Sequence, residues 1–304
     1  MKSKIHAQTR VRRLPMARML APFLLAAGLA LPGLAQAQAA FATPEKAADA
    51  LIEATATNDP AALSNVLGKG WREMISLEEP NIQNRYAFLE KSSQARTIEQ
   101  KDGRAHLVVG SDPWTLPVPI VQDRQGQWRF DTVLGREEIA SRRIGANERA
   151  AMQVMLAYVD AQIEYAQADR NGDGAPEYAQ KLISSPGKRD GLIWSRSLGD
   201  ESPLGEAFLP AKPGQGYHGY RARILTAQGP KAPGGARSYL IGPRMVSGYA
   251  LVAWPVKYGV TGVTSFIVNQ SGIVYERDLG PDTANAVRAI KTFNPDEGWK
   301  PARP

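Results

Sequence analysis

The apolar run from Met19 to Leu31 constrains the fold most, because it separates a leader from the part of the chain that must build a core. Six basic residues precede the run, no acidic residue occurs before Glu45, and an A-x-A pattern follows in Ala35-Gln36-Ala37-Gln38-Ala39. A basic head, an apolar stretch and an A-x-A end are the three parts of a secretory signal. A membrane span needs roughly 20 apolar residues. The run therefore predicts a cleaved signal peptide, residues 1–39, and not a membrane anchor.

Removing this leader changes what the charge implies. The 304-residue chain has a net charge of +7, and six positive charges lie in residues 1–39, so the remainder carries about +1. A strongly basic chain favours nucleic acid or anionic membrane as a partner; a nearly neutral one does not. We expect a periplasmic or secreted protein with no nucleic-acid partner and no integral membrane segment after signal cleavage. Its partner class would be an envelope protein or a cell-wall component, with the oligomeric state left open.

Cysteine is absent from the sequence. Exported proteins often use disulfides, but this chain must be stabilised by its core alone. The roughly 265 residues that follow the leader suffice for one large domain or two of ordinary size. Thiol chemistry, iron–sulfur clusters and cysteine zinc sites are excluded.

Residues 40–143 have the pattern of a small N-terminal α+β unit. Thr43-Pro44 and Asp59-Pro60 each provide a helix cap followed by proline, and a third helix is expected from about Asn81 to Lys91. Strand patterns follow, with Asp102-Gly103 as a tight hairpin turn. The remaining strand candidates are Trp114–Gln122, which Pro117 and Pro119 make an edge or irregular strand, and Gly126–Leu134. This order is similar to that of nuclear-transport-factor-2-like domains.

Residues 144–304 predict a second α+β unit, a long helix packed on an antiparallel sheet. Asn147-Glu148 is expected to open the helix, whose apolar residues recur at helical spacing. A loop-rich stretch follows to about residue 216, and a last helix is expected over Asp282–Lys291. The strand candidates are Tyr217–Thr226, Ala236–Ile241, Gly248–Pro255, Val263–Asn269 and Gly272–Arg277.

Several strings in the chain carry a family resemblance, among them Phe41-Ala-Thr-Pro-Glu, Gly126-Gln-Trp-Arg-Phe-Asp-Thr, Tyr158-Val-Asp-Ala-Gln, Ser185-Pro-Gly-Lys-Arg-Asp-Gly-Leu and Phe266-Ile-Val-Asn-Gln-Ser-Gly. They resemble an uncharacterised family of exported bacterial proteins, domain of unknown function 2950. The resemblance implies export and no assigned activity or catalytic residues. The part from the long helix onward also resembles soluble pilin-type domains, although the matching helix is internal and amphipathic here.

One segment has the composition of a cation-binding loop. Asp169, Asn171, Asp173 and Glu177 place oxygen side chains at alternating positions around Gly172 and Gly174. This spacing follows the opening of an EF-hand loop, which binds calcium. The position that should supply a bidentate Glu is Gln180, however. The alternatives are therefore a weak calcium site and a solvated turn after the long helix.

Nucleophilic catalysis has little support in the sequence. A Ser–His–Asp site needs a histidine oriented by a carboxylate, and Ser185, Asp190 and His218 are the only such trio that can be named. No G-x-S-x-G motif accompanies them. Lys188 and Arg189, near Trp194, suit either an anionic ligand or a turn with solvated charges.

These observations favour a non-enzymatic binding or assembly component of the bacterial envelope, with no catalytic residues and no cofactor assigned beyond calcium. One alternative is an envelope hydrolase acting on cell-wall or carbohydrate material, which predicts carboxylates that converge in a concave pocket with a strongly shifted pKa. The other is a calcium-stabilised structural module.

Overall fold

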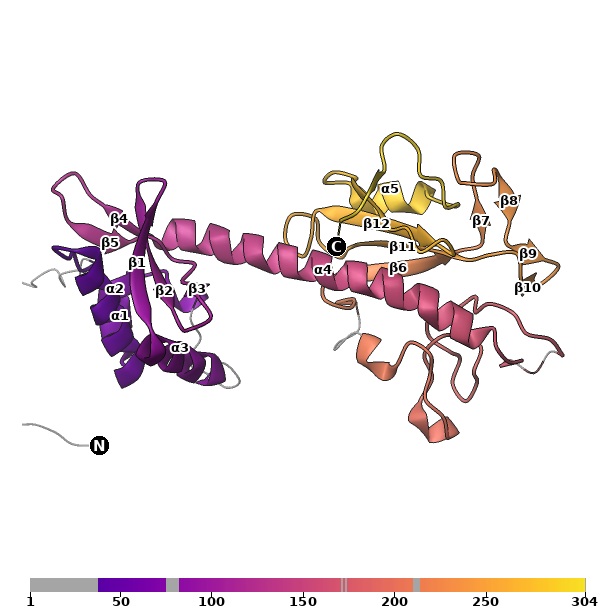
Figure 1. The fold of residues 1–304 in the computed structure, drawn as a ribbon, viewed down its shortest axis with the longest axis horizontal. Helices are drawn as coiled ribbons and strands as arrows, with labels where there is room; N and C mark the ends of the chain where they lie inside the picture. Colours follow the sequence, from indigo (N-terminus) through magenta and orange to yellow (C-terminus); the bar gives the residue numbers. More distant parts are fainter. Residues whose placement is uncertain (1–37, 75–81, 171, 173, 210–213, 304) are drawn as a thin grey trace, which may run out of the picture. The chain divides into compact units, whose positions relative to one another are not determined.

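The computed structural model describes residues 38–74, 82–170, 172, 174–209 and 214–303. The leader, residues 1–39, therefore lies outside the described residues except for its last two positions. The described chain contains helices and antiparallel sheets, so the predicted α+β class is confirmed (Figure 1). Among the described residues, no helix combines the length and the apolar character that a membrane span requires.

The N-terminal elements begin at the caps that the sequence predicts. The Thr43 hydroxyl accepts a hydrogen bond from the Lys46 N–H, the Asp59 carboxylate accepts one from the Ala61 N–H, and Gly68 ends the second helix. The elements are α1 (Pro44–Thr57), α2 (Pro60–Leu67), η1 (Trp71–Glu73), α3 (Ile82–Gln94), β1 (Arg96–Lys101), β2 (Arg104–Val109), β3 (Trp114–Thr115), β4 (Ile120–Gln122) and β5 (Trp128–Phe130).

These strands form one antiparallel sheet in the order β1-β2-β4-β5, with β3 paired to β2. The β1–β2 hairpin turns at Asp102-Gly103, where both residues have positive φ, as a tight hairpin turn requires. The segment Trp114–Gln122 is not one strand: it forms β3 and β4, and its two prolines lie in the interruption between them. A core of buried apolar side chains from the helices and the sheet includes Leu51, Leu67, Trp71, Leu107, Ile120 and Phe130.

Helix α4 (Thr132–Tyr165) is longer than the sequence predicts. The expected start was Asn147, but the helix begins 15 residues earlier, where the Asp131 carboxylate accepts hydrogen bonds from the N–H groups of Val133 and Leu134. The predicted strand Gly126–Leu134 is correspondingly short, because β5 ends at Phe130. The proposed boundary between residues 143 and 144 therefore falls within a continuous helix.

All five C-terminal strand candidates contain strands, and the last helix is present but shorter. The elements are η2 (Arg196–Leu198), η3 (Glu206–Phe208), β6 (Tyr220–Leu225), β7 (Ala227–Gln228), β8 (Arg237–Ser238), β9 (Leu240–Ile241), β10 (Arg244–Met245), β11 (Ala250–Pro255), β12 (Thr264–Asn269), β13 (Tyr275–Asp278), α5 (Thr283–Ala289) and β14 (Lys300–Pro301). They form a second antiparallel sheet in the order β14-β13-β12-β11-β6, with two short two-stranded ladders, β7–β8 and β9–β10.

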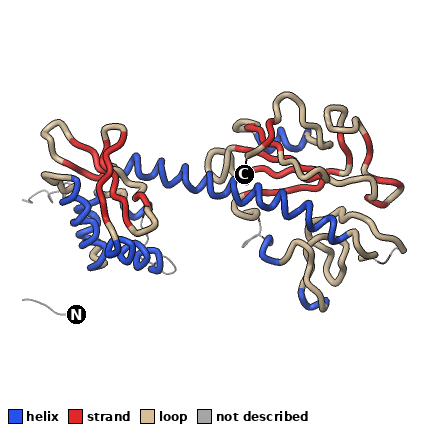
Figure 2. Tube along the Cα trace, viewed as in Figure 1, coloured by secondary structure: helices blue, strands red, loops and turns tan. Residues whose placement is uncertain are grey.

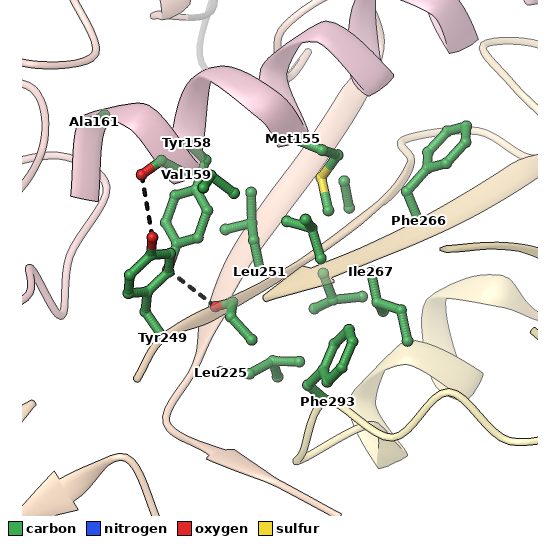
Figure 3. Close-up of a cluster of buried hydrophobic side chains, with 14 of the residues drawn as sticks. Met155, Tyr158, Val159, Ala161, Leu225, Tyr249, Leu251, Phe266, Ile267 and Phe293 are labelled. Carbon is green, nitrogen blue, oxygen red and sulfur yellow. Dashed lines mark hydrogen bonds between the residues drawn. The ribbon is translucent and has the colours of Figure 1, made fainter. Parts of the chain in front are cut away.

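The second half of α4 packs on this sheet over β11 and β12. Met155 and Tyr158 of the helix contact a fully buried cluster that includes Leu251, Phe266 and Ile267 (Figure 3). Buried hydroxyl groups reach backbone carbonyls across this layer: Tyr158 Oη donates to Ala250 O, and Tyr249 Oη donates to Val159 O. The methionines of α4 are therefore core residues, as the helical spacing predicts.

Between α4 and β6, the chain forms a long segment with only two short 3-10 turns and no strand among its described residues. Figure 2 shows it in tan, below the last turns of α4. Its apolar side chains Leu192, Ile193, Trp194 and Leu204 are buried in the same core as the sheet. Long connections of this kind are uncommon in compact domains and are frequently functional.

Candidate functional site

The segment between α4 and β6, which we call the irregular segment, is held in place at two points. The first is the carboxylate of Asp190. Asp190 Oδ2 accepts hydrogen bonds from Lys181 Nζ at 2.6 Å and from Ser185 Oγ at 2.9 Å, and Oδ1 accepts one from the Ser185 N–H at 2.7 Å. Burial works to raise the pKa of Asp190, but these bonds outweigh it and lower that pKa to about 2. Charge-assisted bonds of this length are the strong ones. The carboxylate therefore stays ionised and closes the loop 181–190.

A second cluster fixes the next part of the segment. The guanidinium of Arg189 donates to Asp200 Oδ1 from two nitrogens, at 2.9 and 2.6 Å, and to the Leu198 carbonyl at 2.6 Å. The Arg170 guanidinium lies 3.5 Å from Asp200 Oδ2 and 5.7 Å from the centre of the Trp194 ring. Among the described residues, the Lys188 side chain makes no hydrogen bond or ion pair, whereas Arg189 and Trp194 of the predicted anion-binding loop bond to the loop itself.

Other residues of the segment that these contacts hold form one wall of an apolar groove next to the edge strand β6, which we call the β6 groove. Its volume is about 290 Å³, close to the lower end of ligand pockets. Helix α4, strands β6 and β11, and the irregular segment all contribute to it. Its lining residues are Ala151, Val154, Leu182, Ile183, Ile193, Leu204, Phe208, Gly216, Tyr217, Tyr220, Arg221, Ala222, Ala253 and Trp254.

A smaller hollow of about 230 Å³ adjoins the β6 groove and shares Ile183 and Ile193 with it. Ile183 leaves 55% of its surface exposed, whereas the other aliphatic side chains that line the β6 groove are partly or fully buried. An exposed large apolar side chain in a concave, apolar site is a feature of binding surfaces. The irregular segment therefore presents apolar surface on a rigid support.

A larger cavity lies elsewhere and has a different character. It measures about 550 Å³ and is lined by residues of β1, β2 and the first turns of α4, among them Glu99, His106, Glu137 and Glu138. The carboxylates here are solvent-exposed, and Glu138 is paired with Arg142 at 2.7 Å. Such a surface of mixed, exposed charge lacks the burial that distinguishes a catalytic carboxylate.

The predicted trio of Ser185, Asp190 and His218 is only partly assembled. Ser185 and Asp190 are in direct contact, but within the described residues no hydrogen bond joins His218 to either. The His218 ring is exposed and lies 4.4 Å from the Tyr217 ring, edge to face. Lys181 takes the third position, with its Nζ 2.9 Å from Ser185 Oγ.

This arrangement does not activate Ser185 as a nucleophile. Activation requires a base that takes the hydroxyl proton, and a useful general base has a pKa near the working pH. The hydroxyl donates to Asp190, whose pKa of about 2 makes it a very weak base, and Lys181 is the cation of the ion pair. The cluster is suited to closing a loop.

The predicted calcium ligands lie where α4 ends, and two of them, Asn171 and Asp173, are outside the described residues. Asp169 uses both carboxylate oxygens on its own loop: Oδ1 accepts from the Gly172 N–H at 2.8 Å and Oδ2 from the Gly174 N–H at 2.9 Å. The described residues contain no group of three or more His, Asp or Glu arranged to hold a metal ion. Calcium binding by Asp169, Asn171, Asp173 and Glu177 stays one of two predictions, and these hydrogen bonds favour the other one, a solvated turn.

Sequence reasoning did not identify the β6 groove. Its lining residues come from four separate stretches of the chain, and none of them was among the candidate site residues that the sequence predicted. The available signal was the irregular stretch before residue 216, combined with the apolar residues Leu182, Ile183 and Phe208 within it.

Comparison with known proteins identifies a family and no activity. The family model described as "Protein of unknown function (DUF2950)" matches residues 38–302, almost the whole described chain. No curated protein and no solved structure matches the chain.

Proposed function

The chain belongs to the DUF2950 family of proteins of unknown function, and we propose that it is an exported, non-enzymatic binding protein of the bacterial envelope. In this proposal the β6 groove receives an apolar part of an envelope partner. The observation that carries the proposal is the groove itself: apolar surface held on an irregular segment by two clusters of charge-assisted hydrogen bonds.

Export is supported by the composition of residues 1–39, with its basic head, apolar run and A-x-A end. The near-neutral charge of the remaining chain fits a partner recognised by apolar contact. Such a partner does not need a strong electrostatic field. Both points also fit the periplasmic or secreted location expected above.

The pKa values of the carboxyl groups favour a binding role over a hydrolytic one. A glycosidase needs an acid whose pKa is raised toward the working pH. The pKa values of Glu45, Asp123 and Asp190 are all shifted downward, with hydrogen bonds from backbone or side-chain donors as the lowering cause. These groups are ionised structural acceptors and not proton donors.

The resemblances to pilin-type and nuclear-transport-factor-2-like domains are part of the same proposal. Residues 144–304 carry a long helix on an antiparallel sheet, as soluble pilin-type domains do, and residues 40–143 have the helices-then-strands order of nuclear-transport-factor-2-like domains. Because α4 is internal and its second half packs in the core, we propose binding through the groove and not assembly through a terminal apolar helix.

The test measures both export and binding. N-terminal sequencing of protein purified from the native cell should begin near residue 38 or 40, in the periplasmic or extracellular fraction. Co-sedimentation of the mature chain with washed envelope membranes and cell wall should show saturable binding. The variant Ile183→Asp should weaken this binding at least about tenfold, because a charge enters the apolar groove.

A matched control is Ile241→Asp. Ile241 is also an exposed isoleucine, 66% exposed, in the two-stranded β9–β10 ladder and outside the groove. We expect the Ile241→Asp variant to bind the envelope fraction as tightly as the unmodified chain does. A protein that starts at Met1 in the cytosol would refute export, and equal binding by all three chains would refute the role of the groove.

A further inference from the structure

β6 is the edge strand of the C-terminal sheet, and one side of it carries unpaired backbone groups. It pairs with β11 alone, from Tyr220↔Pro255 to Leu225↔Ala250. In an antiparallel pair, alternate residues exchange hydrogen bonds with the partner strand, and the residues between them point their N–H and C=O groups away. The register therefore decides which residues of β6 are available to another chain.

The hydrogen bonds at the ends of β6 fix this alternation. The Val256 N–H donates to Gly219 O at 2.8 Å, so Gly219 faces β11, whereas Tyr220 exchanges two hydrogen bonds with Tyr217 on the outer side. At the other end, Thr226 O accepts from the Tyr239 N–H, again on the outer side. Because every second residue of the strand points its N–H and C=O groups outward, the outward-pointing residues between Tyr220 and Thr226 are Ala222 and Ile224.

In the part of the chain that the structure describes, no hydrogen bond reaches the outer N–H and C=O groups of Ala222 and Ile224. These four groups span about 7 Å of strand. Ala222 also lines the β6 groove, together with Tyr220 of the same face of the strand and with Ala151 of α4. The free edge and the apolar groove are thus one continuous site.

We propose that the occupant of the β6 groove is an extended polypeptide segment that adds a strand to β6. This inference rests on the proposed function and names its partner class. The unpaired backbone groups decide between occupants: an acyl chain placed here would bury them without partners, which is costly, whereas an extended peptide satisfies all four. Alternate side chains of the peptide then enter the groove, so the segment alternates apolar and polar residues.

Charge adds a second element of recognition. Arg221 lines the groove and is exposed, and its one hydrogen bond in the described chain is a 3.3 Å contact with the Gly214 carbonyl. It takes part in no ion pair of the described residues, whereas Arg223 on the same strand is held by the carbonyls of Val287 and Ile290. The bound segment therefore carries an acidic residue among its polar positions.

The decisive variant is Ala222→Pro. The Ala222 N–H points away from β11, so proline removes an outer donor without removing a ladder bond, and edge strands tolerate proline in that orientation. The matched control Ala222→Ser keeps the N–H at nearly the same size. Circular dichroism and melting temperature of both variants should match the unmodified chain, which establishes that each is folded.

The probe is a fluorescein-labelled Val-Glu-Val-Thr-Val peptide, measured by fluorescence anisotropy on the mature chain. We expect saturable binding that is weakened about tenfold by Ala222→Pro and unchanged by Ala222→Ser, in line with the loss of a backbone hydrogen bond and a steric block at the edge. The same peptide with N-methyl groups on alternate residues should bind equally weakly. Replacing its Glu by Lys should also weaken binding.

Other outcomes separate this inference from the proposed function. Loss of envelope binding in Ile183→Asp, with no effect of Ala222→Pro or of N-methylation on peptide binding, would overturn strand addition and leave the groove as a site for another ligand. Protease treatment of the envelope fraction gives an independent reading: binding that survives it has a non-protein partner and also overturns the inference. If Ile183→Asp had no effect on envelope binding, the proposed function would be wrong.

Discussion

The side-chain amide of Gln162 pairs with both backbone groups of Ala179. Gln162 Nε2 donates to Ala179 O at 2.8 Å, and Gln162 Oε1 accepts from the Ala179 N–H at 2.8 Å. Both residues are buried, and Gln162 is fully so. A side chain of α4 thus takes the place of a strand neighbour for the irregular segment, which has no ladder of its own there.

Replacing Gln162 by leucine should destabilise the protein by about 2–4 kcal/mol, because it leaves two buried backbone groups without partners. Thermal or urea unfolding of the mature chain measures the loss. The control is Gln153→Leu, at an exposed position of the same helix, with an expected change within about 0.5 kcal/mol. Equal stability of the two variants would mean that Ala179 is not held through Gln162.

Asp190 should contribute stability that depends on pH. Its folded pKa of about 2 lies below the ordinary value of 3.8, so its contribution is fully present above pH 3.8 and is lost as the pH falls through 2. We expect Asp190→Asn to lower the free energy of unfolding by about 1–2 kcal/mol at pH 7. The difference from the unmodified chain should narrow between pH 4 and 2. A difference that is constant over this range would contradict the ion pair with Lys181.

Two glycines of α4 should respond to alanine in opposite directions. Alanine in a helix interior is normally more stable than glycine by about 0.5–1 kcal/mol. At Gly145 a Cβ would meet only Arg149 Nη1 at 3.5 Å, so Gly145→Ala should stabilise by that amount. At Gly135 it would lie 2.8 Å from Val118 Cγ2 and 3.2 Å from Val118 Cα, so Gly135→Ala should destabilise. Urea unfolding of both variants tests the contrast, and stabilisation by Gly135→Ala would show that α4 does not pack on Val118.

The elements that the sequence predicted well are those determined by neighbouring residues. The caps Thr43 and Asp59 and the Asp102-Gly103 turn each act within a few positions, so their outcomes follow from local chemistry. The start of α4 was missed because Asp131 follows a strand pattern directly and Gly135 and Gly145 weaken the helix signal. In the structure, the Asp131 cap and the packing of Gly135 on Val118 outweigh that low propensity.

The β6 groove could not be derived from local patterns. It depends on the β6–β11 register and on hydrogen bonds such as Arg189 to Asp200, which connect loop residues that have no periodicity. The sequence identified Ser185, Asp190 and Arg189 as notable polar residues, but it gave no means of knowing that they bond to the loop itself. Irregular segments are specified by such particular contacts, and these become visible only when the chain is folded.

Calcium gives the last test, at the loop that follows α4. We expect the melting temperature of the mature chain to be the same in chelator and in millimolar calcium. Calcium needs six to eight oxygen ligands, yet both oxygens of Asp169 already accept backbone N–H groups, and the Gln180 amide donates to the Pro243 carbonyl at 2.7 Å. A site with a dissociation constant tenfold below the calcium concentration would add about 1.4 kcal/mol by mass action.

Asp169→Asn controls for the role of the carboxylate in the turn. The variant weakens the bonds to Gly172 and Gly174 and should therefore lower the melting temperature equally with and without calcium. If calcium instead raises the melting temperature of the unmodified chain and fails to raise that of Asp169→Asn, the loop is a cation site. In that case Asp169 exchanges its backbone partners for the ion, and the turn that its hydrogen bonds to Gly172 and Gly174 form is the calcium-free form of the loop.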